Sequence, residues 1–328
     1  MANFEETELE RTCVEAIIGK PAANRVWESA VIIQGPYSAT HTPIVIDNFL
    51  ERNSSSVLLI VSTYFPGACK SVDSFLNQKH LNILSGREAI HSGRLVFIFV
   101  NPPPKTDESG FWKTNYWNQN LHRLTTFVGL RYADQLGILV SLKCRSDCFL
   151  GMRNINRWLF DNFLIRIPPI PPARSAKYFS SKMRGRIVVS DHAKSLEENP
   201  HQTNIGKHFV PDFWSFGFTR DLMAFFDIRS SSAWNGGLGI RIDSAAETHL
   251  AETWMKSVGI DMTPDGVIEL TARYLGIASS VEVEMVALKF EFNYFRYLEE
   301  GKSYLRGYLR ECSTFGNTHY LRSLALVN

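Results

Sequence analysis

The stretch from Gly137 to Leu150 places three charged side chains directly after an apolar run. The run Ile138 to Leu142 is followed by Lys143, Arg145 and Asp147. A short aliphatic run with polar flanks predicts a strand buried on both faces, whose carboxyl end is where an open α/β sheet binds ligands. Two cations and a carboxylate at that end suit a polyanion with a divalent metal, and a nucleoside diphosphate is the obvious candidate. An ordinary strand end with solvated charges explains the same pattern.

Three other apolar runs also end in small or hydrogen-bonding residues. After Ala30 to Ile33, Val57 to Val61 and Leu95 to Val100, the chain continues with Gln34, Gly35 and Pro36, with Ser62 and Thr63, and with Asn101. Glycine and proline after a strand make a turn in which backbone amides approach a ligand closely. Repetition at several strand ends predicts one shared ligand-binding edge, with routine turn chemistry as the alternative. The sequence lacks both the GxGxxG fingerprint of dinucleotide-binding proteins and a phosphate-binding P-loop.

The segments between these runs have helical periodicity. Apolar residues recur at spacings of three and four over Thr42 to Arg52 and Asn115 to Gln135, and we also expect an N-terminal helix near Glu6 to Ile18. Strands that alternate with helices predict an α/β fold with a mainly parallel, Rossmann-like nucleotide-binding sheet. The polar residues of the second helix face either a binding site or water, and they are Asn118, Gln119 and Arg123.

The proline-rich stretch at 168–172 divides the chain, because it continues neither a helix nor a central strand. We expect an N-terminal helical segment at 1–29 and a nucleotide-binding half at 30–167. Residues 168–328 form the second half of the same domain.

In the second half, the apolar pattern predicts a short strand, several helices and a final strand. Their ranges are Gly185 to Ser190 for the short strand, Arg220 to Asp227, Ala245 to Met255 and Asp265 to Leu275 for the helices, and Glu282 to Phe292 for the last strand. Between them we expect a mobile polar loop at 193–206 and an aromatic stretch with one carboxylate at 208–217.

The composition is that of an ordinary globular protein with little net charge. The 328 residues are 45% hydrophobic and 21% charged, and the formal net charge is +2. This balance argues against a dedicated nucleic-acid binder, whose affinity depends on the neutralisation of phosphates. Residues 143–186 are locally basic, with ten Lys or Arg against two acids. Such a segment suits an anionic substrate, an anionic membrane surface or a plain solvated face.

Cysteine usage and hydropathy indicate the compartment. The five cysteines form no CxxC pair, so neither a zinc site nor a disulfide framework is indicated. The N-terminus lacks the basic-then-apolar order of a secretory signal, and no apolar run is long enough to span a bilayer. We therefore expect a cytoplasmic protein that is soluble or at most peripheral to a membrane.

Five short blocks occur in a characteristic order along the chain. They are VIIQGP at 31–36, VSTY at 61–64, NQNLHRLTTFVGL at 118–130, SLKCRSD at 141–147 and VPDFWSFG at 210–217. Their order and spacing resemble those of the WavE-type lipopolysaccharide-synthesis family, over roughly residues 30–255. That family consists of sugar-nucleotide glycosyltransferases of the GT-A type. The resemblance implies transfer of a sugar from a nucleotide sugar to a glycan or lipid-linked oligosaccharide, with the acceptor bound by the second half of the domain.

The resemblance also implies a donor site with a divalent metal, Mn or Mg. GT-A enzymes hold the metal with an Asp-x-Asp element at a strand end, and here Asp147 occupies the second acidic position while Arg145 replaces the first. This departure puts the metal in doubt, since a hard cation prefers several oxygen ligands, and a guanidinium neutralises a diphosphate directly. The other residues of the implied donor site are Gln34, Gly35, Pro36, Ser62, Thr63, Asn118, Gln119, Arg123 and Lys143.

Glycosyl transfer also needs a group that takes the proton of the acceptor hydroxyl, unless the leaving phosphate takes it. Asp212 is the best candidate, because aromatic neighbours stack on sugars and raise the basicity of a carboxyl by desolvation. Glu247, at the start of a predicted helix, is the second candidate. Each also fits a structural role, Asp212 in a turn and Glu247 at a helix N-terminus.

Three functions stay open on the sequence alone. A glycosyltransferase fits best. A non-catalytic carbohydrate- or nucleotide-binding protein that has lost the metal chemistry is the second hypothesis, and Arg145 motivates it. Another nucleotide-dependent α/β enzyme, such as a methyltransferase or a nucleotidyltransferase, is the third, and the lack of a Gly-rich loop after the first strand weakens it.

Overall fold

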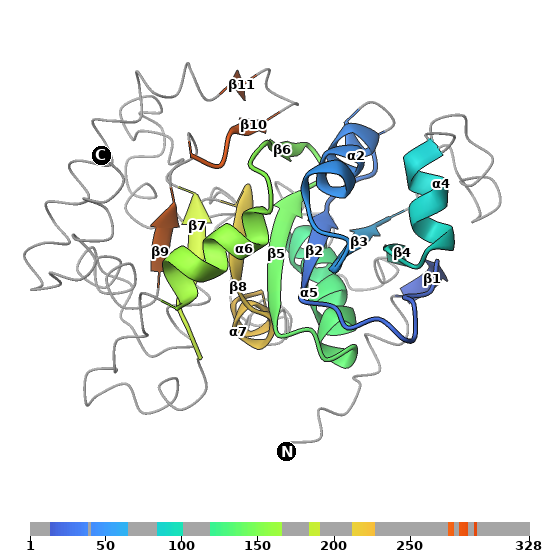
Figure 1. Cartoon of the computed structure of the whole chain (residues 1–328), viewed down its shortest axis with the longest axis horizontal. Helices are drawn as coiled ribbons and strands as arrows, with labels where there is room; N and C mark the ends of the chain where they lie inside the picture. Colours follow the sequence, from blue (N-terminus) through green and yellow to red (C-terminus); the bar gives the residue numbers. More distant parts are fainter. Residues whose placement is uncertain are drawn as a thin grey trace, which may run out of the picture.

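The computed structural model of the chain describes residues 14–38, 41–64, 84–100, 119–165, 184–190, 212–226, 275–278, 282–287 and 292–293. Within these ranges the fold is built on a sheet of eight strands in the order β1-β4-β3-β2-β5-β8-β7-β9 (Figure 1). The strands are β1 (Val14–Ile18), β2 (Ser29–Gln34), β3 (Val57–Thr63), β4 (Leu95–Val100), β5 (Val140–Arg145), β7 (Ile187–Ser190), β8 (Trp214–Phe218) and β9 (Leu275–Ala278).

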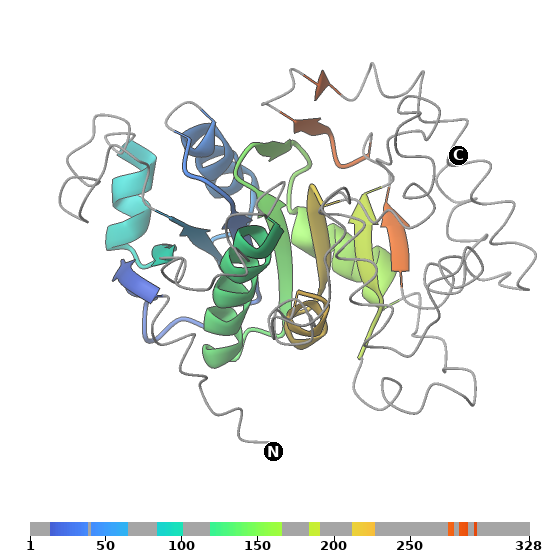
Figure 2. The same cartoon turned by 180° about the vertical axis from the view of Figure 1, so that it is seen from behind.

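Helices cover both faces of this sheet, as the two opposite views show (Figures 1 and 2). They are α2 (Thr42–Arg52), α4 (Leu84–His91), α5 (Gln119–Gln135), α6 (Ile155–Leu159) and α7 (Thr219–Phe225), with a short π-helical segment η2 (Phe160–Leu164) after α6. The helices α2 and α6 lie in front of the sheet in Figure 1, whereas α5 lies in front of it in Figure 2.

Most strands of the sheet run in one direction. β2 pairs in parallel with β3 and with β5, and β3 pairs in parallel with β4. β8 is antiparallel to both β5 and β7, so β7 and its parallel partner β9 again run with β5. Of the described strands in this sheet, β1 and β8 alone oppose the others. The predicted α/β fold with a mainly parallel sheet is confirmed.

The order of the strands reverses at β2. From β2 the chain moves outward to β3 and then to β4, and it returns to the opposite side of β2 to form β5. The next strand of this sheet after β2 is β3, on one side of β2, whereas the next after β5 is β7, on the other side. In open α/β sheets, this topological switch point is where ligands bind.

The two faces of the sheet differ in polarity. On the face covered by α2 and α6, Ile33 and Cys144 lie in register and belong to one large apolar cluster. On the other face, the side chain of Ile32 meets Gly129 of α5. Lys143 is in register with Ile32, so it also points toward α5, because in-register residues of parallel strands share a face. The α5 face therefore admits polar side chains between the sheet and its helix.

A second sheet supports the turn that follows β5. It contains β6 (Cys148–Leu150), β10 (Met285–Ala287) and β11 (Phe292–Asn293), in the order β11-β10-β6. Both pairings are antiparallel. A segment from late in the chain thus holds the backbone immediately after Asp147.

The predicted elements of the first half agree closely with the observed ones. α2 and β4 have the predicted bounds, and α5 confirms the predicted second helix from Gln119 onward. β5 ends at Arg145 rather than at Leu142, so Lys143 and Arg145 belong to the strand itself. An apolar run is a poor guide to the end of this strand, because one of its faces accepts polar side chains.

The predicted helix over Glu6 to Ile18 is wrong for its last residues. Val14–Ile18 form β1, which alternates between half-buried and exposed residues and pairs antiparallel with β4. A short apolar run fits both the helical and the strand period, and the edge of β4 offers unpaired backbone groups that decide the outcome. Residues 1–13 lie outside the described residues.

In the second half, β7 and α7 confirm the short strand and the helix after the aromatic stretch. Leu275 begins β9 instead of ending a helix, because it completes the pairing of β7. The strand predicted over Glu282 to Phe292 is divided into β10 and β11. The remaining expectations lie outside the described residues, and they concern 168–172, 193–206, 245–255 and 265–274.

The division at 1–29, 30–167 and 168–328 stays a prediction. In the part of the chain that the structure describes, we find no helix with the length and apolar character needed to cross a membrane.

We expect Gly129→Ala to lower the free energy of unfolding by about 1–3 kcal/mol, although alanine favours a helix. A Cβ at Gly129 would lie 2.5 Å from Cγ2 of Ile32 and 3.2 Å from Cβ of Ser62, so α5 would have to move away from the sheet. Urea unfolding measures the effect. In an Ile32→Ala background the colliding methyl is absent, and the same change should cost less. An equal cost in both backgrounds would contradict the collision.

Candidate functional site

The candidate site lies at the carboxyl ends of β2, β3 and β5, next to the topological switch point. Gln34 of β2 is in register with Ser62 of β3 and with Arg145 of β5. The predicted convergence of these strand ends at one edge is confirmed.

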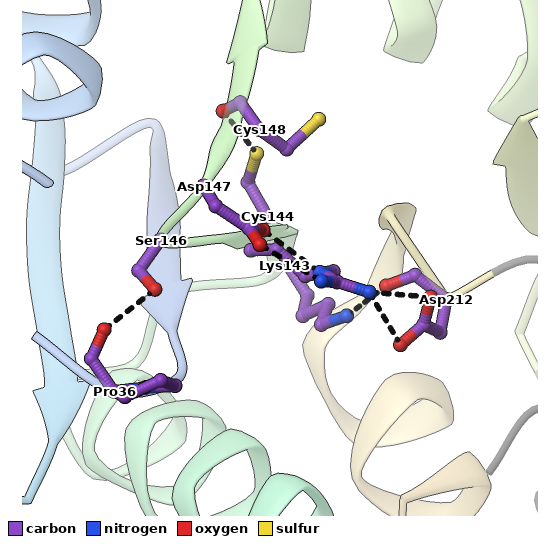
Figure 3. A network of polar contacts seen from close by, with 8 residues as sticks. Pro36, Lys143, Cys144, Ser146, Asp147, Cys148 and Asp212 are labelled. Atoms are coloured by element: carbon purple, nitrogen blue, oxygen red, sulfur yellow. Dashed lines mark hydrogen bonds and ion pairs between the residues drawn. The ribbon is translucent and has the colours of Figure 1, made fainter. Parts of the chain in front are cut away.

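Hydrogen bonds fix the turn after β2 against the turn after β5. Ser146 donates its backbone N–H to the carbonyl of Gln34 at 2.8 Å and its hydroxyl to the carbonyl of Pro36 at 2.9 Å (Figure 3). The Thr63 hydroxyl donates to the carbonyl of Gly35 at 2.7 Å. Gly35 has a φ of +123°, and a Cβ there would lie 2.9 Å from Oγ of Ser146. Glycine is therefore required at this position.

The antiparallel strand β8 brings a distant carboxylate to the same edge. Because β8 opposes β5, its first residues lie beside the last residues of β5. The backbone N–H of Arg145 donates to the carbonyl of Phe213 at 3.0 Å. Asp212, which is 67 residues after Arg145, accepts hydrogen bonds from Nη1 of that arginine at 3.2 Å and 3.3 Å.

Arg145 is held between two carboxylates. Its Nε donates to Oδ1 of Asp147 at 2.9 Å and its Nη2 donates to Oδ2 of the same residue at 2.8 Å. Asp212 approaches from the other side (Figure 3). The guanidinium also lies over the ring of Phe213, with 5.1 Å from Cζ to the ring centroid. Bidentate, charge-assisted pairing and stacking together give Arg145 one orientation.

Lys143 is completely buried beneath this ion pair. Its ammonium donates to the backbone carbonyl of Asp212 and lies 5.7 Å from the ring centroid of Phe226. Burial lowers the pKa of Lys143 to about 8, although the negative charge of Asp212 acts in the opposite direction. Lys143 was expected beyond the strand end, but it lies inside the strand and supports the residue that holds Arg145.

The expected rise in the basicity of Asp212 is not found. Burial alone would raise the pKa of Asp212, but the positive charges of Arg145 and Lys143 outweigh burial and hold this pKa well below its ordinary value. A carboxylate with so low a pKa is a weak base. The pKa of Asp212 is therefore set by the neighbouring cations and not by the aromatic side chains.

Sequence reasoning missed His122, the fourth residue of α5. Its ring packs edge-on against Phe226, with centroids 5.9 Å apart. Burial, and then the charge of Lys143, lower its pKa well below the ordinary value, although Asp212 opposes this shift. Nε2 of His122 has no hydrogen-bond partner among the described residues. The helical spacing of apolar residues gives no signal for it, because a histidine beside Arg123 reads as part of a polar helix surface.

Two predicted donor-binding residues have buried polar atoms that lack a partner in the described part of the chain. These atoms are Oε1 of Gln34 and Oγ of Ser62. Arg123 is also buried, with 2% of its surface exposed, so this residue does not face solvent. Buried polar atoms are rarely left unsatisfied in folded proteins, so these two atoms have hydrogen-bonding capacity for a ligand, a water or a residue outside the described ranges.

The structure brings most of the predicted site residues to one edge. They are Gln34, Gly35, Pro36, Ser62, Thr63, Lys143, Arg145, Asp147 and Asp212. Asn118 and Glu247 lie outside the described residues, and only the backbone of Gln119 is described.

The described residues do not fit the divalent metal that the family resemblance implies. Both carboxylate oxygens of Asp147 already accept hydrogen bonds from Arg145. In the ranges that the structure covers, no three His, Cys, Asp or Glu side chains are grouped so as to hold a metal ion. A hard divalent cation takes several oxygen ligands, and the two described carboxylates at this edge, Asp147 and Asp212, are both paired with the positive charge of Arg145.

Comparisons with known proteins give distant likenesses. No protein-family model matches the chain, and no curated protein matches it. It is similar to a crystal structure of the galactosyltransferase LgtC in complex with donor and acceptor sugar analogues, with a TM-score of 0.36 and 10% identity over 77% of this chain and 73% of that chain. It is also similar to a glycosyltransferase involved in the glycosylation of the major capsid of PBCV-1, with a TM-score of 0.30 and 11% identity over 77% and 82% of the two chains. Likeness of this extent establishes neither a common fold nor a common activity.

We expect the free energy of unfolding to rise as the pH rises from about 8 to about 10.5, relative to the variant Lys143→Met. In this window the folded protein has released the Lys143 proton, whose folded pKa is about 8, whereas the unfolded chain keeps it until its pKa of 10.5. The unfolded state binds more protons there, so stability increases with pH. The shift corresponds to roughly 3 kcal/mol.

Urea unfolding of wild type, Lys143→Met and Lys143→Arg at about pH 7.5 and about pH 10 measures this difference. Arginine stays charged across the window, so Lys143→Arg should lack the rise. The same pH dependence in all three proteins would show that Lys143 is not a destabilised buried ammonium.

Proposed function

We propose that the protein is a glycosyltransferase that moves a sugar from a nucleotide-sugar donor to a glycan or lipid-linked oligosaccharide acceptor. The single observation that carries the proposal is the fixed guanidinium of Arg145 at the topological switch point between β2 and β5. Phosphate groups of nucleotides bind at such points in open α/β sheets.

The electrostatics of this edge favour a diphosphate. Arg145 presents a planar set of N–H groups that matches the geometry of phosphate oxygens. Its side chain is 21% exposed, so a ligand can reach it. α5 starts at this edge, since its other end leads directly to the amino end of β5. The first turn of a helix has unpaired backbone N–H groups and a positive partial charge, which add to the attraction for an anion.

Support for sugar transfer in particular comes from the blocks that resemble the WavE-type family. Residues 31–36 form most of β2 and the turn after it, and 61–64 include the end of β3. Residues 141–147 form most of β5 and the turn after it, and 210–217 contain Asp212 and most of β8. These segments are far apart in the sequence but meet at one edge of the sheet. We infer that these blocks together form one binding site for the donor.

In the proposed reaction, the acceptor hydroxyl forms a bond to the anomeric carbon of the donor sugar. The bond between that carbon and the diphosphate oxygen breaks, and its electron pair leaves with the nucleoside diphosphate. Arg145 stabilises the negative charge that develops on the leaving oxygen. The hydroxyl proton passes to a base or to the leaving phosphate itself.

We propose that Asp212 contributes by holding Arg145 rather than by taking the proton. Its low pKa supports this assignment, because a strong ion pair weakens a base and strengthens an anchor. Glu247 remains the alternative base proposed from the sequence.

A second candidate function is a non-catalytic carbohydrate- or nucleotide-binding protein. The observation that favours it is that both described carboxylates of the site are committed to Arg145. Release of nucleoside diphosphate from a nucleotide sugar separates the two functions, since a binding protein is stabilised by the donor but does not consume it.

We expect a thermal-shift panel of nucleotide sugars to contain at least one that raises the melting temperature of the protein. The same nucleotide sugar should be consumed, with release of its nucleoside diphosphate, when glycan acceptors are supplied. Stabilisation without consumption favours the binding protein. The absence of stabilisation by every nucleotide sugar and nucleoside diphosphate would overturn the glycosyltransferase and the nucleotide-binding protein.

The variant Asp212→Asn tests how Asp212 acts. If this residue anchors Arg145, the variant should raise the KM for the donor by roughly 10-fold or more and change kcat less. A general base predicts the opposite, a kcat lowered by roughly 100-fold or more with donor affinity unchanged. The matched control is Asp161→Asn, because Asp161 pairs with Arg157 at 2.8 Å on the exposed surface of the π-helical segment. This control should leave both constants unchanged.

A further inference from the structure

We infer that Arg145 takes the place of a divalent metal ion at the donor diphosphate, so that diphosphate binding at this edge needs no Mg²⁺ or Mn²⁺. The inference rests on the proposed function, because it concerns the charge that faces the donor in the same site. It is drawn from the hydrogen bonds that Arg145 donates to Asp147 and Asp212, and from the bond that Lys143 donates to the backbone of Asp212.

The carboxylate that would bind a metal is already paired with a cation. Asp147 accepts one hydrogen bond on each oxygen from Arg145, at 2.9 Å and 2.8 Å. A divalent cation on the remaining lone pairs of Asp147 would lie within a few ångströms of the positive charge of Arg145. Repulsion between the two cations makes metal binding beside this charge-assisted pair unfavourable.

The acids at this edge also have their counter-charges within the protein. Asp147 and Asp212 are both paired with Arg145, and the Lys143 ammonium contacts the backbone of Asp212. Neighbouring carboxylates repel each other, and a nearby positive charge offsets this repulsion. Here two cationic side chains balance the two described carboxylates, so these two acids need no metal to neutralise them.

Arg145 keeps the capacity to contact a phosphate while it holds both acids. A guanidinium carries five N–H groups, and its hydrogen bonds to Asp147 and Asp212 use at most four of them. The side chain is 21% exposed, whereas Lys143 is fully buried. Burial alone would lower the pKa of Arg145, but Asp212 and Asp147 raise it, so the group stays charged. Arg145 is therefore a permanent cation with a fixed direction.

Binding of inorganic pyrophosphate to the full chain, measured by titration calorimetry, tests the inference without knowledge of the sugar or the base. We expect the Kd in EDTA to agree within about 3-fold with the Kd in excess Mg²⁺. Arg145→Ala should weaken binding by about 10-fold or more in both conditions. Arg145→Lys should weaken it too, because an ammonium lacks the planar fork that both acids and the phosphate use.

The matched control is Arg157→Ala, which removes an exposed arginine that is paired with a single aspartate and should leave pyrophosphate binding unchanged. Circular dichroism and melting temperature show whether each variant is folded, and the lysine variant keeps the charge if the alanine variant does not fold. Asp147→Asn gives a second readout. If Asp147 binds a metal ion, wild type binds pyrophosphate only in Mg²⁺, and binding by Asp147→Asn does not increase when Mg²⁺ is added. This outcome overturns the inference.

The same measurements distinguish a failure of the inference from a failure of the proposed function. Metal-free pyrophosphate binding without consumption of any nucleotide sugar supports the inference and overturns the glycosyltransferase. Consumption that requires Mg²⁺ or Mn²⁺ supports the glycosyltransferase and overturns the inference. A lack of pyrophosphate binding in both EDTA and Mg²⁺ also overturns the inference.

Discussion

The ion pairs that join Arg145 to Asp147 and Asp212 are the interaction on which the site depends. They exist because β8 runs antiparallel to β5, which places the start of one strand beside the end of the other. The backbone hydrogen bond from Arg145 to Phe213 fixes that distance. With an acid on each side and an aromatic ring against one face, the guanidinium keeps its direction before any ligand arrives. A charge that is preorganised in this way needs no reorganisation when an anion binds beside it.

The same arrangement explains why one charged group of the cluster, the ammonium of Lys143, destabilises the folded state. Lys143 is buried against a backbone carbonyl and the ring of Phe226, and its pKa falls because an ammonium there is poorly compensated. Asp212 is also buried, but it lies between two cations and remains ionised. Charged groups with strongly shifted pKa values are found preferentially at functional sites. The apolar face beneath α2 and α6 stabilises the fold, so the α5 face can hold this polar cluster.

Much of the fold follows from local patterns in the sequence. Strands buried on both faces appear as continuous aliphatic runs, so β2, β3 and β4 were located to within a few residues. Apolar spacing located α2 and α5, and the alternation of these elements indicated a mainly parallel sheet. Gln34, Ser62 and Arg145 lie at one edge because β2, β3 and β5 are parallel, and parallel strands have their carboxyl ends at the same edge of the sheet. In β1, where a short apolar run fits both periods, the local pattern led to the wrong element.

The sequence by itself determined that Arg145 and Asp147 lie together at the carboxyl end of β5, because two positions so close in the chain cannot be far apart. Only the tertiary structure decided that Asp212 joins them, since strand pairing across 67 residues has no local signature. It also decided that Lys143 is buried and that Asp212 is a weak base. A pKa depends on every charge and every desolvating group around the side chain, whatever its position in the chain. The aromatic neighbours of Asp212 in the sequence suggested a pKa raised by desolvation. Folding brings cations close to Asp212, and these cations lower its pKa instead.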